Sequence, residues 1–178
     1  MKQANISTML EAVSFAARKH AGQLRKDNST PYIAHPFRVM TILATVFQVD
    51  DPEVLAAAAL HDTIEDTATD YDEVFERFGE RVADMVAVLS KDKRRPDPIR
   101  EKEYFEGLCD APIEVRLCKL ADLYDNLSDA ATLLPASRGK TIAKAQQALE
   151  AFASGFPEEY RWALDRFEQR LKVAISSN

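Results

Sequence analysis

Several things are scarce or absent in this 178-residue sequence, and each absence excludes a class of protein. There is no surplus of basic residues: 23 Lys and Arg against 29 Asp and Glu give a formal net charge of −6, whereas general nucleic-acid binding needs a basic footprint. No apolar run approaches the roughly 20 residues that span a bilayer, and the best runs only from Val54 to Leu60. The polar N-terminus lacks the apolar centre of a secretory signal. We therefore expect neither a nucleic-acid nor a membrane partner.

Cysteine is also rare. Cys109 and Cys118 are the only two, and both fall within helical patterns. A disulfide framework in a small domain needs more, so we predict buried thiols in a reducing compartment, which favours the cytoplasm. Hydrophobic residues, by contrast, make up 46% of the chain, and that much apolar material excludes disorder because it offsets the entropy lost on folding.

Glycine (five residues) and period-two alternation are scarce as well, which argues against β-strands. Apolar residues recur instead at helical spacing, with prolines and glycines at the segment ends. The sequence predicts a single, compact, all-α domain over residues 1–178, a bundle of about nine helices. The expected helices cover residues 6–19, 36–47, 54–66, 70–78, 80–89, 100–108, 112–129, 140–152 and 158–175.

The helix expected from Pro112 to Asp129 has apolar residues on two faces. One face is a stripe from Ile113 to Leu127, and the other carries Asp122 and Asn126 between apolar neighbours. A helix that is apolar on both sides is central in a bundle. Asp122 and Asn126 are then expected to be enclosed, where polar groups need partners.

A run of alanine and leucine ends in a dense cluster of ionisable side chains. His61, Asp62, Glu65 and Asp66 follow Leu60 within six residues. On a continuous helix these four side chains fill an arc of about 140°. Three carboxylates on one arc repel one another, and a divalent cation that accepts imidazole and carboxylate together would offset this repulsion.

Two more candidate ligands come from other parts of the chain: His35, immediately before Pro36, and Asp122. Together with His61 and Asp62 they supply two nitrogens and at least two oxygens, which leaves positions open for water and a phosphoryl oxygen. Such a site lowers the pKa of a bound water and polarises a P–O bond.

Each of these residues alone has a plainer explanation. A histidine before proline is more often a helix cap, an isolated aspartate such as Asp122 is more often solvated or capping, and Glu65 and Asp66 would suit an exposed face. A metal site is favoured by their joint occurrence in one order between His35 and Asn126.

The segments that carry this order resemble a known family, the HD-domain hydrolases of the RelA/SpoT type, and specifically their single-domain small alarmone hydrolases. The matching segments are HAGQLRK (20–26), PYIAHP (31–36), ALHDTIEDT (59–67) and KLAD (119–122) with Asn126. The resemblance implies an all-helical fold that uses Mn²⁺. It also implies hydrolysis of the 3′-pyrophosphate of guanosine tetra- or pentaphosphate to GDP or GTP plus pyrophosphate, which degrades the alarmone of the stringent response.

The resemblance assigns roles by position. The family's metal ligands are matched by His35, His61, Asp62 and Asp122. The acidic pair that handles the attacking water is matched by Glu65 and Asp66, and a carboxylate close to a metal can take or relay a proton.

Three further residues match the family's substrate contacts. Arg25 and Lys26 match a basic pair in the nucleotide pocket, where the planar guanidinium packs against the base. Asn126 matches a residue that contacts the nucleoside.

The leaving pyrophosphate needs basic side chains that neutralise its charge. Residues 91–102 hold six basic residues against three acidic ones, although a solvated linker would look the same. The candidates in this segment are Lys91, Lys93, Arg94 and Arg95, with Lys93 as the first choice.

Departures from the family pattern put the base preference in doubt. Leu123 stands where a basic residue is usual, Asp125 where a neutral or aromatic one is more usual, and the loop at 27–30 lacks a glycine. Adenosine alarmones and the 2′-phosphate of NADPH are therefore alternative substrates, and a catalytically silent nucleotide-sensing domain is a third alternative. The sequence leaves open the oligomeric state and, because mixed nitrogen and oxygen sites bind several metals, the divalent ion.

Overall fold

The computed structural model describes residues 2–94 and 96–176, and within them the chain is helical. These residues form no β-strand, and a single isolated bridge pairs Leu24 with Pro31. The all-α prediction is confirmed. The described α-helices are α1 (Lys2–Lys19), α2 (Ala34–Thr45), α3 (Pro52–Leu60), α4 (Thr63–Asp66), α5 (Tyr71–Phe78), α6 (Glu80–Leu89), α7 (Asp97–Asp110), α8 (Ile113–Ser128), α9 (Pro135–Ala153) and α10 (Arg161–Ser176).

Helix α3 is enclosed by the rest of the fold. All its residues from Val54 to Leu60 are buried, and α1, α2, α6 and α8 pack around it. A helix that is apolar all round must lie inside the molecule. Pro52 opens it, where a missing N–H costs nothing, and the Asp51 side chain accepts a hydrogen bond from the Glu53 amide (2.9 Å). The helix therefore delivers the residues that follow Leu60 to the interior.

The continuous helix expected over residues 54–66 is wrong, because it is interrupted at His61 and Asp62. α3 ends at Leu60 and α4 begins at Thr63. Both intervening residues keep αR backbone angles, and the Thr63 hydroxyl donates to the Leu60 carbonyl oxygen (2.7 Å). The interruption accounts for ten α-helices in the described chain rather than about nine. Because of the interruption, the arc of about 140° calculated for a continuous helix describes the four charged side chains only approximately.

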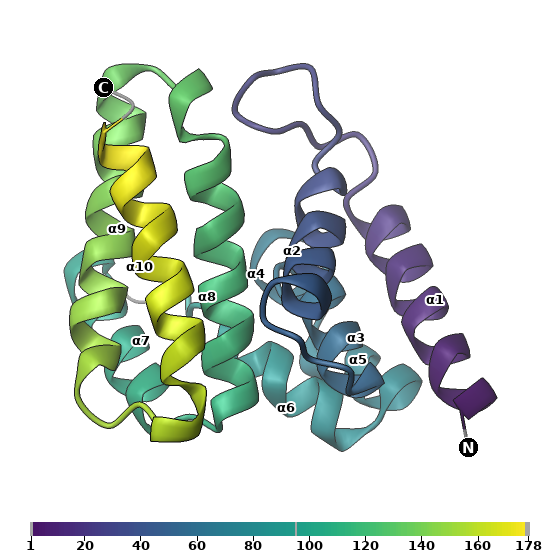
Figure 1. Ribbon diagram of the computed structural model, residues 1–178. Coiled ribbons are helices and arrows are strands. Elements are labelled where there is room, and N and C mark those ends of the chain that lie inside the picture. The colour runs from purple at the N-terminus through teal and green to yellow at the C-terminus, as the bar shows by residue number, and fades with distance from the viewer. Residues whose placement is uncertain (1, 95, 177–178) are drawn as a thin grey trace.

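Helix α8 lies between the N-terminal helices and the C-terminal pair. It packs against α2 on one side and against α9 and α10 on the other (Figure 1). This central place explains its two apolar faces. The prediction that Asp122 is enclosed is confirmed, since only 7% of its surface is exposed.

Segment ends show smaller differences from expectation. Helix α9 begins at Pro135 rather than at residue 140, with proline in its first turn. The loop at 27–30 has no glycine, and Asn28 takes the left-handed conformation there (φ 58°), which asparagine tolerates better than most residues.

Cys109 and Cys118 are free thiols, half-buried and buried, as predicted. Along the described chain no helix has both the length and the apolar character to cross a membrane.

Candidate metal centre

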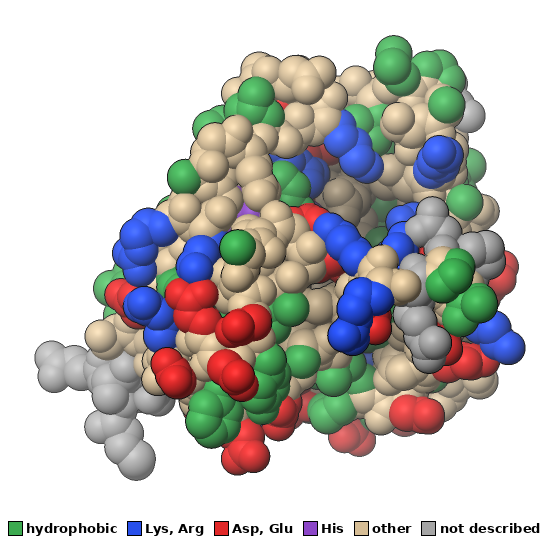
Figure 2. Space-filling model, turned by 180° about the vertical axis from the view of Figure 1, so that it is seen from behind, with side chains coloured by type: hydrophobic (Ala, Val, Ile, Leu, Met, Phe, Trp, Pro, Cys, Tyr) green, Lys and Arg blue, Asp and Glu red, His purple; other side chains and the backbone are tan. Residues whose placement is uncertain are grey.

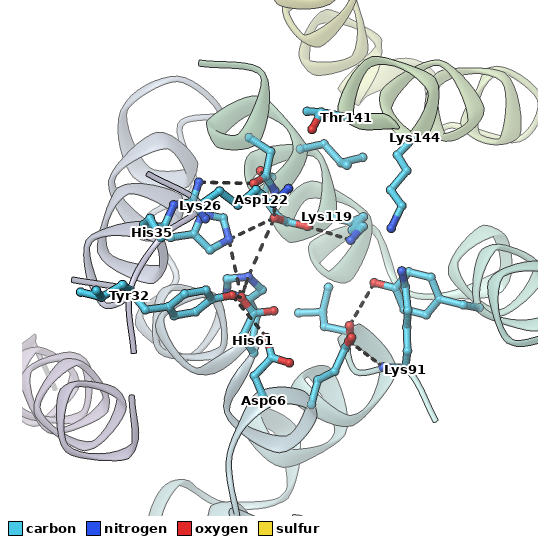
Figure 3. A pocket seen from close by; sticks show the side chains of 18 residues that line it. Lys26, Tyr32, His35, His61, Asp66, Lys91, Lys119, Asp122, Thr141 and Lys144 are labelled. Atoms are coloured by element: carbon cyan, nitrogen blue, oxygen red, sulfur yellow. Dashed lines mark hydrogen bonds and ion pairs between the residues drawn. The ribbon is translucent and has the colours of Figure 1, made fainter. Parts of the chain in front are cut away.

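Two histidines and two aspartates from distant parts of the chain face one point. One ligand atom each from His35, His61 and Asp62 lies within 4.8 Å of the other two. The Oδ1 atom of Asp122 lies 3.2 Å from His35 Nε2 and 4.0 Å from His61 Nε2. Figure 3 shows His35, His61 and Asp122 turned toward one another from three different elements. The four predicted ligands are thus brought together, by α2, by the end of α3 and by α8.

Both imidazole rings are oriented by a contact at Nδ1. His61 Nδ1 lies 2.9 Å from the Ala58 carbonyl oxygen, and His35 Nδ1 lies 2.7 Å from Asp125 Oδ2. Each ring therefore turns Nε2 toward the common point. His61 Nε2 is buried, and its polar neighbours among the described residues are carboxylate oxygens of Asp62 and Asp122, at 3.0 and 4.0 Å. A buried nitrogen in this condition is suited to bind a metal through its lone pair.

The electrostatics of the cluster also suit a cation. Burial lowers the pKa of His35, but hydrogen bonds to Asp122 and Asp125 outweigh burial and raise that pKa to about 9. Burial likewise raises the pKa of Asp62, while the charges of His61 and His35 and the hydrogen bond to His61 together lower it more strongly. The carboxylates thus stabilise positive charge at the centre of the cluster. A divalent cation supplies that charge, and imidazole nitrogen with carboxylate oxygen is a donor set that first-row divalent ions accept.

A cavity of about 360 Å³ opens beside these four residues. Its size is in the range of small-ligand pockets. Figure 2 shows this hollow from outside, with Lys and Arg side chains around it and acidic side chains within. Five of the six other predicted site residues line it: Arg25, Lys26, Glu65, Asp66 and Asn126.

Residues 12–154 of the chain match the HD domain family, which covers most of the sequence and includes all four converging residues. The chain belongs to the HD-domain family.

Several relatives of this HD domain are named for an enzymatic activity. It is 42% identical over 130 residues to the zebrafish (Danio rerio) guanosine-3′,5′-bis(diphosphate) 3′-pyrophosphohydrolase MESH1, covering 72% of each chain, and 45% identical over 122 residues to the human MESH1, covering 68% of each. The bifunctional (p)ppGpp synthase/hydrolase SpoT of Escherichia coli is 35% identical over 154 residues, which are 83% of this chain and 21% of that protein. A solved structure described as a metazoan SpoT orthologue that hydrolyses ppGpp superposes with a TM-score of 0.80 at 30% identity, covering 92% and 94% of the two chains. The family predicted from the motifs is confirmed.

The acidic pair of the HD domain lies at the edge of the cluster. Glu65 lines the cavity, and its Oε2 accepts a hydrogen bond from the Lys91 amide (3.0 Å). Asp66 is more exposed, and its Oδ1 forms an ion pair with Lys93 Nζ at 2.6 Å. Neither carboxylate belongs to the three residues, His35, His61 and Asp62, whose ligand atoms all lie within 4.8 Å of one another.

The predicted substrate contacts on the α2 side also meet. Arg25 Nη2 lies 3.4 Å from Asn126 Oδ1 and 3.1 Å from Asp129 Oδ2. Asn126 in turn donates from Nδ2 to Asp122 Oδ1 (2.6 Å), which links this wall of the cavity to the cluster. Leu123 is buried and gives the cavity an apolar part.

Lys93 is the one predicted site residue that does not line this cavity. Its side chain is 55% exposed and paired with Asp66, and Arg94 pairs with Asp92. Arg95 lies outside the described residues.

Three other lysines, Lys91, Lys119 and Lys144, line the cavity on the side away from His35 and Tyr32 (Figure 3). Sequence reasoning named Lys91 without preferring it. It included Lys119 only as part of the KLAD segment, without a role, and named no candidate residue after Asn126.

Tyr32 is another residue that the sequence did not single out, although it belongs to the PYIAHP segment. Its hydroxyl donates to Asp62 Oδ2 at 2.5 Å. Burial and the charge of Asp62 raise the pKa of the Tyr32 phenol well above its usual range. The phenol therefore stays protonated and holds the Asp62 carboxylate in place.

Proposed function

We propose that this protein is a metal-dependent guanosine-3′,5′-bis(diphosphate) 3′-pyrophosphohydrolase, which converts guanosine tetra- or pentaphosphate to GDP or GTP plus pyrophosphate. The observation that carries the proposal is the convergence of His35, His61, Asp62 and Asp122 beside a cavity that also contains a further carboxylate. The activities for which the zebrafish and human relatives are named support the substrate.

The four converging residues hold the metal, for which we propose Mn²⁺. When bound, such an ion lowers the pKa of water and polarises the phosphoryl group. Tyr32 and Asn126 keep the carboxylates of Asp62 and Asp122 in position through hydrogen bonds of 2.5 and 2.6 Å.

Glu65 accepts the proton of the attacking water. The Lys91 amide fixes one carboxylate oxygen of Glu65, so the group is oriented by the backbone and faces the cavity. Asp66 lies further out and relays the proton toward solvent. A positioned carboxylate in this role contributes roughly 10² to 10⁴ in rate.

The lysines of the opposite wall hold the diphosphate that leaves. Lys91 Nζ and Lys144 Nζ lie 2.8 and 3.7 Å from the same oxygen of Glu101. Lys91 Nζ and Lys119 Nζ lie 5.0 and 5.2 Å from the ring centroid of Tyr104.

Three ammonium groups are thereby gathered on one wall with two carboxylates, Glu101 and Asp122, and Asp122 Oδ2 accepts from Lys119 Nζ at 2.7 Å. Burial lowers the pKa of Lys91, and the charges of Lys119 and Lys144 lower it further, whereas Glu101 opposes them. An anion bound here relieves the repulsion and lets the lysines stabilise the charge that develops on the leaving group. On the other side of the cluster, the guanidinium of Arg25 stacks on the base, and Lys26 and Asn126 contact the nucleoside.

A substrate panel with added Mn²⁺ tests the function. The panel compares guanosine 3′,5′-bis(diphosphate), its adenosine analogue and NADPH, and measures pyrophosphate and orthophosphate separately. We expect pyrophosphate and GDP from the guanosine compound, with the highest kcat/KM of the three, and no product from the Asp62→Ala variant. Release of orthophosphate from NADPH alone would contradict the substrate, and no release from any compound would contradict the enzyme.

The lysine wall is tested in the same assay. Lys144→Ala removes a charge-assisted contact with the diphosphate, and we expect kcat/KM to fall about tenfold or more. Lys140→Ala is the matched control, because Lys140 is exposed on the same helix and does not line the cavity. Equal effects of the two substitutions would contradict the proposal that these lysines hold the diphosphate.

A further inference from the structure

Asp125 is a fully buried carboxylate that lies behind the metal centre rather than in it. It is on α8, with 0% of its side chain exposed, and it does not line the cavity. Its Oδ2 lies 2.7 Å from His35 Nδ1, while the other ring nitrogen of His35 faces Asp122 and Asp62 at 3.2 and 3.6 Å. The imidazole is therefore held between two sets of carboxylates that lie on opposite sides of the ring.

This geometry has a consequence for how His35 binds a metal. A neutral imidazole that donates from Nδ1 keeps its lone pair on Nε2, the atom that faces the common point. An anionic acceptor at Nδ1 also makes the ring a stronger ligand and fixes its rotation. His61 is oriented by a weaker hydrogen bond of the same kind, in which the backbone carbonyl of Ala58 accepts from its Nδ1.

We propose that Asp125 is a positioning residue that fixes the tautomer and direction of His35 for metal binding, and that Arg38 is its resident counter-ion. The proposal rests on the assignment of His35 as a metal ligand.

A buried carboxylate without a partner is costly, and Arg38 removes that cost. Arg38 Nε lies 2.6 Å from Asp125 Oδ1, and its Nη2 lies 2.8 Å from Asp129 Oδ1. On α2, His35 and Arg38 are three residues apart, so they present one face to Asp125 of α8 and to Asp129, the C-cap residue of that helix four positions later. One pair of facing helices thus supplies the ligand, the positioning carboxylate and its counter-ion.

Arg25 is a second, more distant cation near Asp125. Its Nη2 lies 3.6 Å from Asp125 Oδ2 and 3.1 Å from Asp129 Oδ2. Arg25 lines the cavity and is proposed above to stack on the base, whereas Arg38 does not line that cavity. When Arg25 turns to substrate, Arg38 still balances the charge of Asp125, so the orientation of His35 does not depend on the bound state.

The test measures metal affinity without catalysis. Protein freed of metal is titrated with Mn²⁺, and the free ion is followed by electron paramagnetic resonance. We expect Asp125→Ala to raise the Mn²⁺ dissociation constant 10- to 100-fold, as loss of a carboxylate behind a ligating histidine does. Asp125→Asn, which keeps the size and an acceptor for Nδ1–H, is expected to fold and to lose less than the alanine variant.

Asp129→Asn is the matched control. Asp129 pairs with both arginines as Asp125 does, but it makes no recorded contact with His35. We expect its Mn²⁺ dissociation constant to stay within threefold of the parent. Equal weakening by Asp129→Asn and Asp125→Ala would mean that the ion pairs only hold α2 on α8, and unchanged affinity in Asp125→Ala would also overturn the proposal.

The tautomer can be observed directly. The chain has only three histidines, so ¹⁵N-labelled imidazole resonances are readily assigned in the protein loaded with diamagnetic Zn²⁺. We expect His35 to be protonated at Nδ1 in the parent and in Asp129→Asn. In Asp125→Ala we expect His35 no longer to be held in this single tautomer.

The variant His35→Ala separates this inference from the metal site itself. Loss of Mn²⁺ binding in His35→Ala with full binding in Asp125→Ala would overturn the positioning role alone. Full binding in both would overturn the ligand assignment, and the positioning role with it.

Discussion

Asp62 and Glu65 are carboxylates of one short segment, yet their surroundings give them different tasks. Asp62 Oδ2 lies 3.0 Å from His61 Nε2 and accepts a hydrogen bond from Tyr32, so it is fixed within the cluster. Glu65 is held by the Lys91 amide and faces the cavity. In the proposed function, position relative to the metal site, rather than residue type, would separate a ligand from a proton acceptor.

Glu65→Gln tests this division at the level of one atom. The amide keeps the shape of the side chain but cannot take a proton at neutral pH, so we expect kcat to fall by roughly 10² or more. The Mn²⁺ dissociation constant should stay within about threefold of the parent. Steady-state kinetics and Mn²⁺ titration measure the two effects.

Asp62→Ala is the contrasting variant, in which metal binding and turnover should be lost together. If Glu65→Gln lost metal to the same extent, Glu65 would be a ligand and its role here would be wrong.

Single residues also show where sequence reasoning stops. His35, His61, Asp62 and Asp122 could be named because their residue types and order are distinctive. Lys93 was preferred over Lys91 because a charged segment does not reveal which side chains turn inward. In the structure Lys91 lines the cavity, its amide donates to Glu65 and its Nζ lies over the Tyr104 ring, and all of this depends on tertiary contacts.

Among the secondary-structure elements, α3 leads directly into the candidate ligands His61 and Asp62, and its N-terminus is secured in two ways. The Asp51 side chain accepts from the Glu53 amide (2.9 Å) and from Arg81 Nη1 (2.8 Å), and Arg81 also pairs with the Glu53 side chain (2.7 Å). The cap thereby joins the start of α3 to α6, which packs against it.

Asp51→Ala removes this cap. We expect the free energy of unfolding, measured by urea denaturation at pH 7, to fall by about 1 to 2 kcal/mol. Burial acts to raise the pKa of Asp51, but the hydrogen bonds from Arg81 and the Glu53 amide, together with the charge of Arg81, outweigh burial and lower that pKa below the usual value of 3.8. The stabilisation is therefore present above pH 3.8 and is lost as the pH falls through the lower pKa of the folded state.

The difference in stability between Asp51→Ala and the parent should accordingly shrink in acid. Asp50→Ala is the control, because Asp50 is exposed, and its effect should stay within about 0.5 kcal/mol. A loss in Asp51→Ala no larger than in Asp50→Ala would show that the cap does not stabilise α3.

Helix positions were predictable where capping residues mark them. Asp70 caps α5, and Gly79 ends it with φ 85°, so its observed bounds agree with expectation. The start of α9 was missed because its first turn has no apolar period, and residues from that helix, Thr141 and Lys144, line the cavity. The contribution of this part of the chain to the site could not be predicted, because it depends on the packing of α9 on α8.

At the scale of the whole molecule, the fold brings three segments to one point. α3 is buried on all sides, α2 and α8 pack against it and against each other, and each supplies or precedes a ligand. The fold class followed from periodicity, because helical spacing is a local property. The distances within the site did not, because they depend on how helices far apart in sequence pack. Asp125 illustrates the limit: in the sequence it was only a departure from a pattern, whereas the structure places it against His35.

The central claim is that these segments enclose one divalent cation, and diffraction tests it most directly. A crystal of the protein soaked in Mn²⁺ is measured at the manganese absorption edge. The account predicts one anomalous peak within coordination distance of His35 Nε2, His61 Nε2 and an oxygen of both Asp62 and Asp122. An absence of anomalous signal at that point, or a peak bound by other residues, would contradict it.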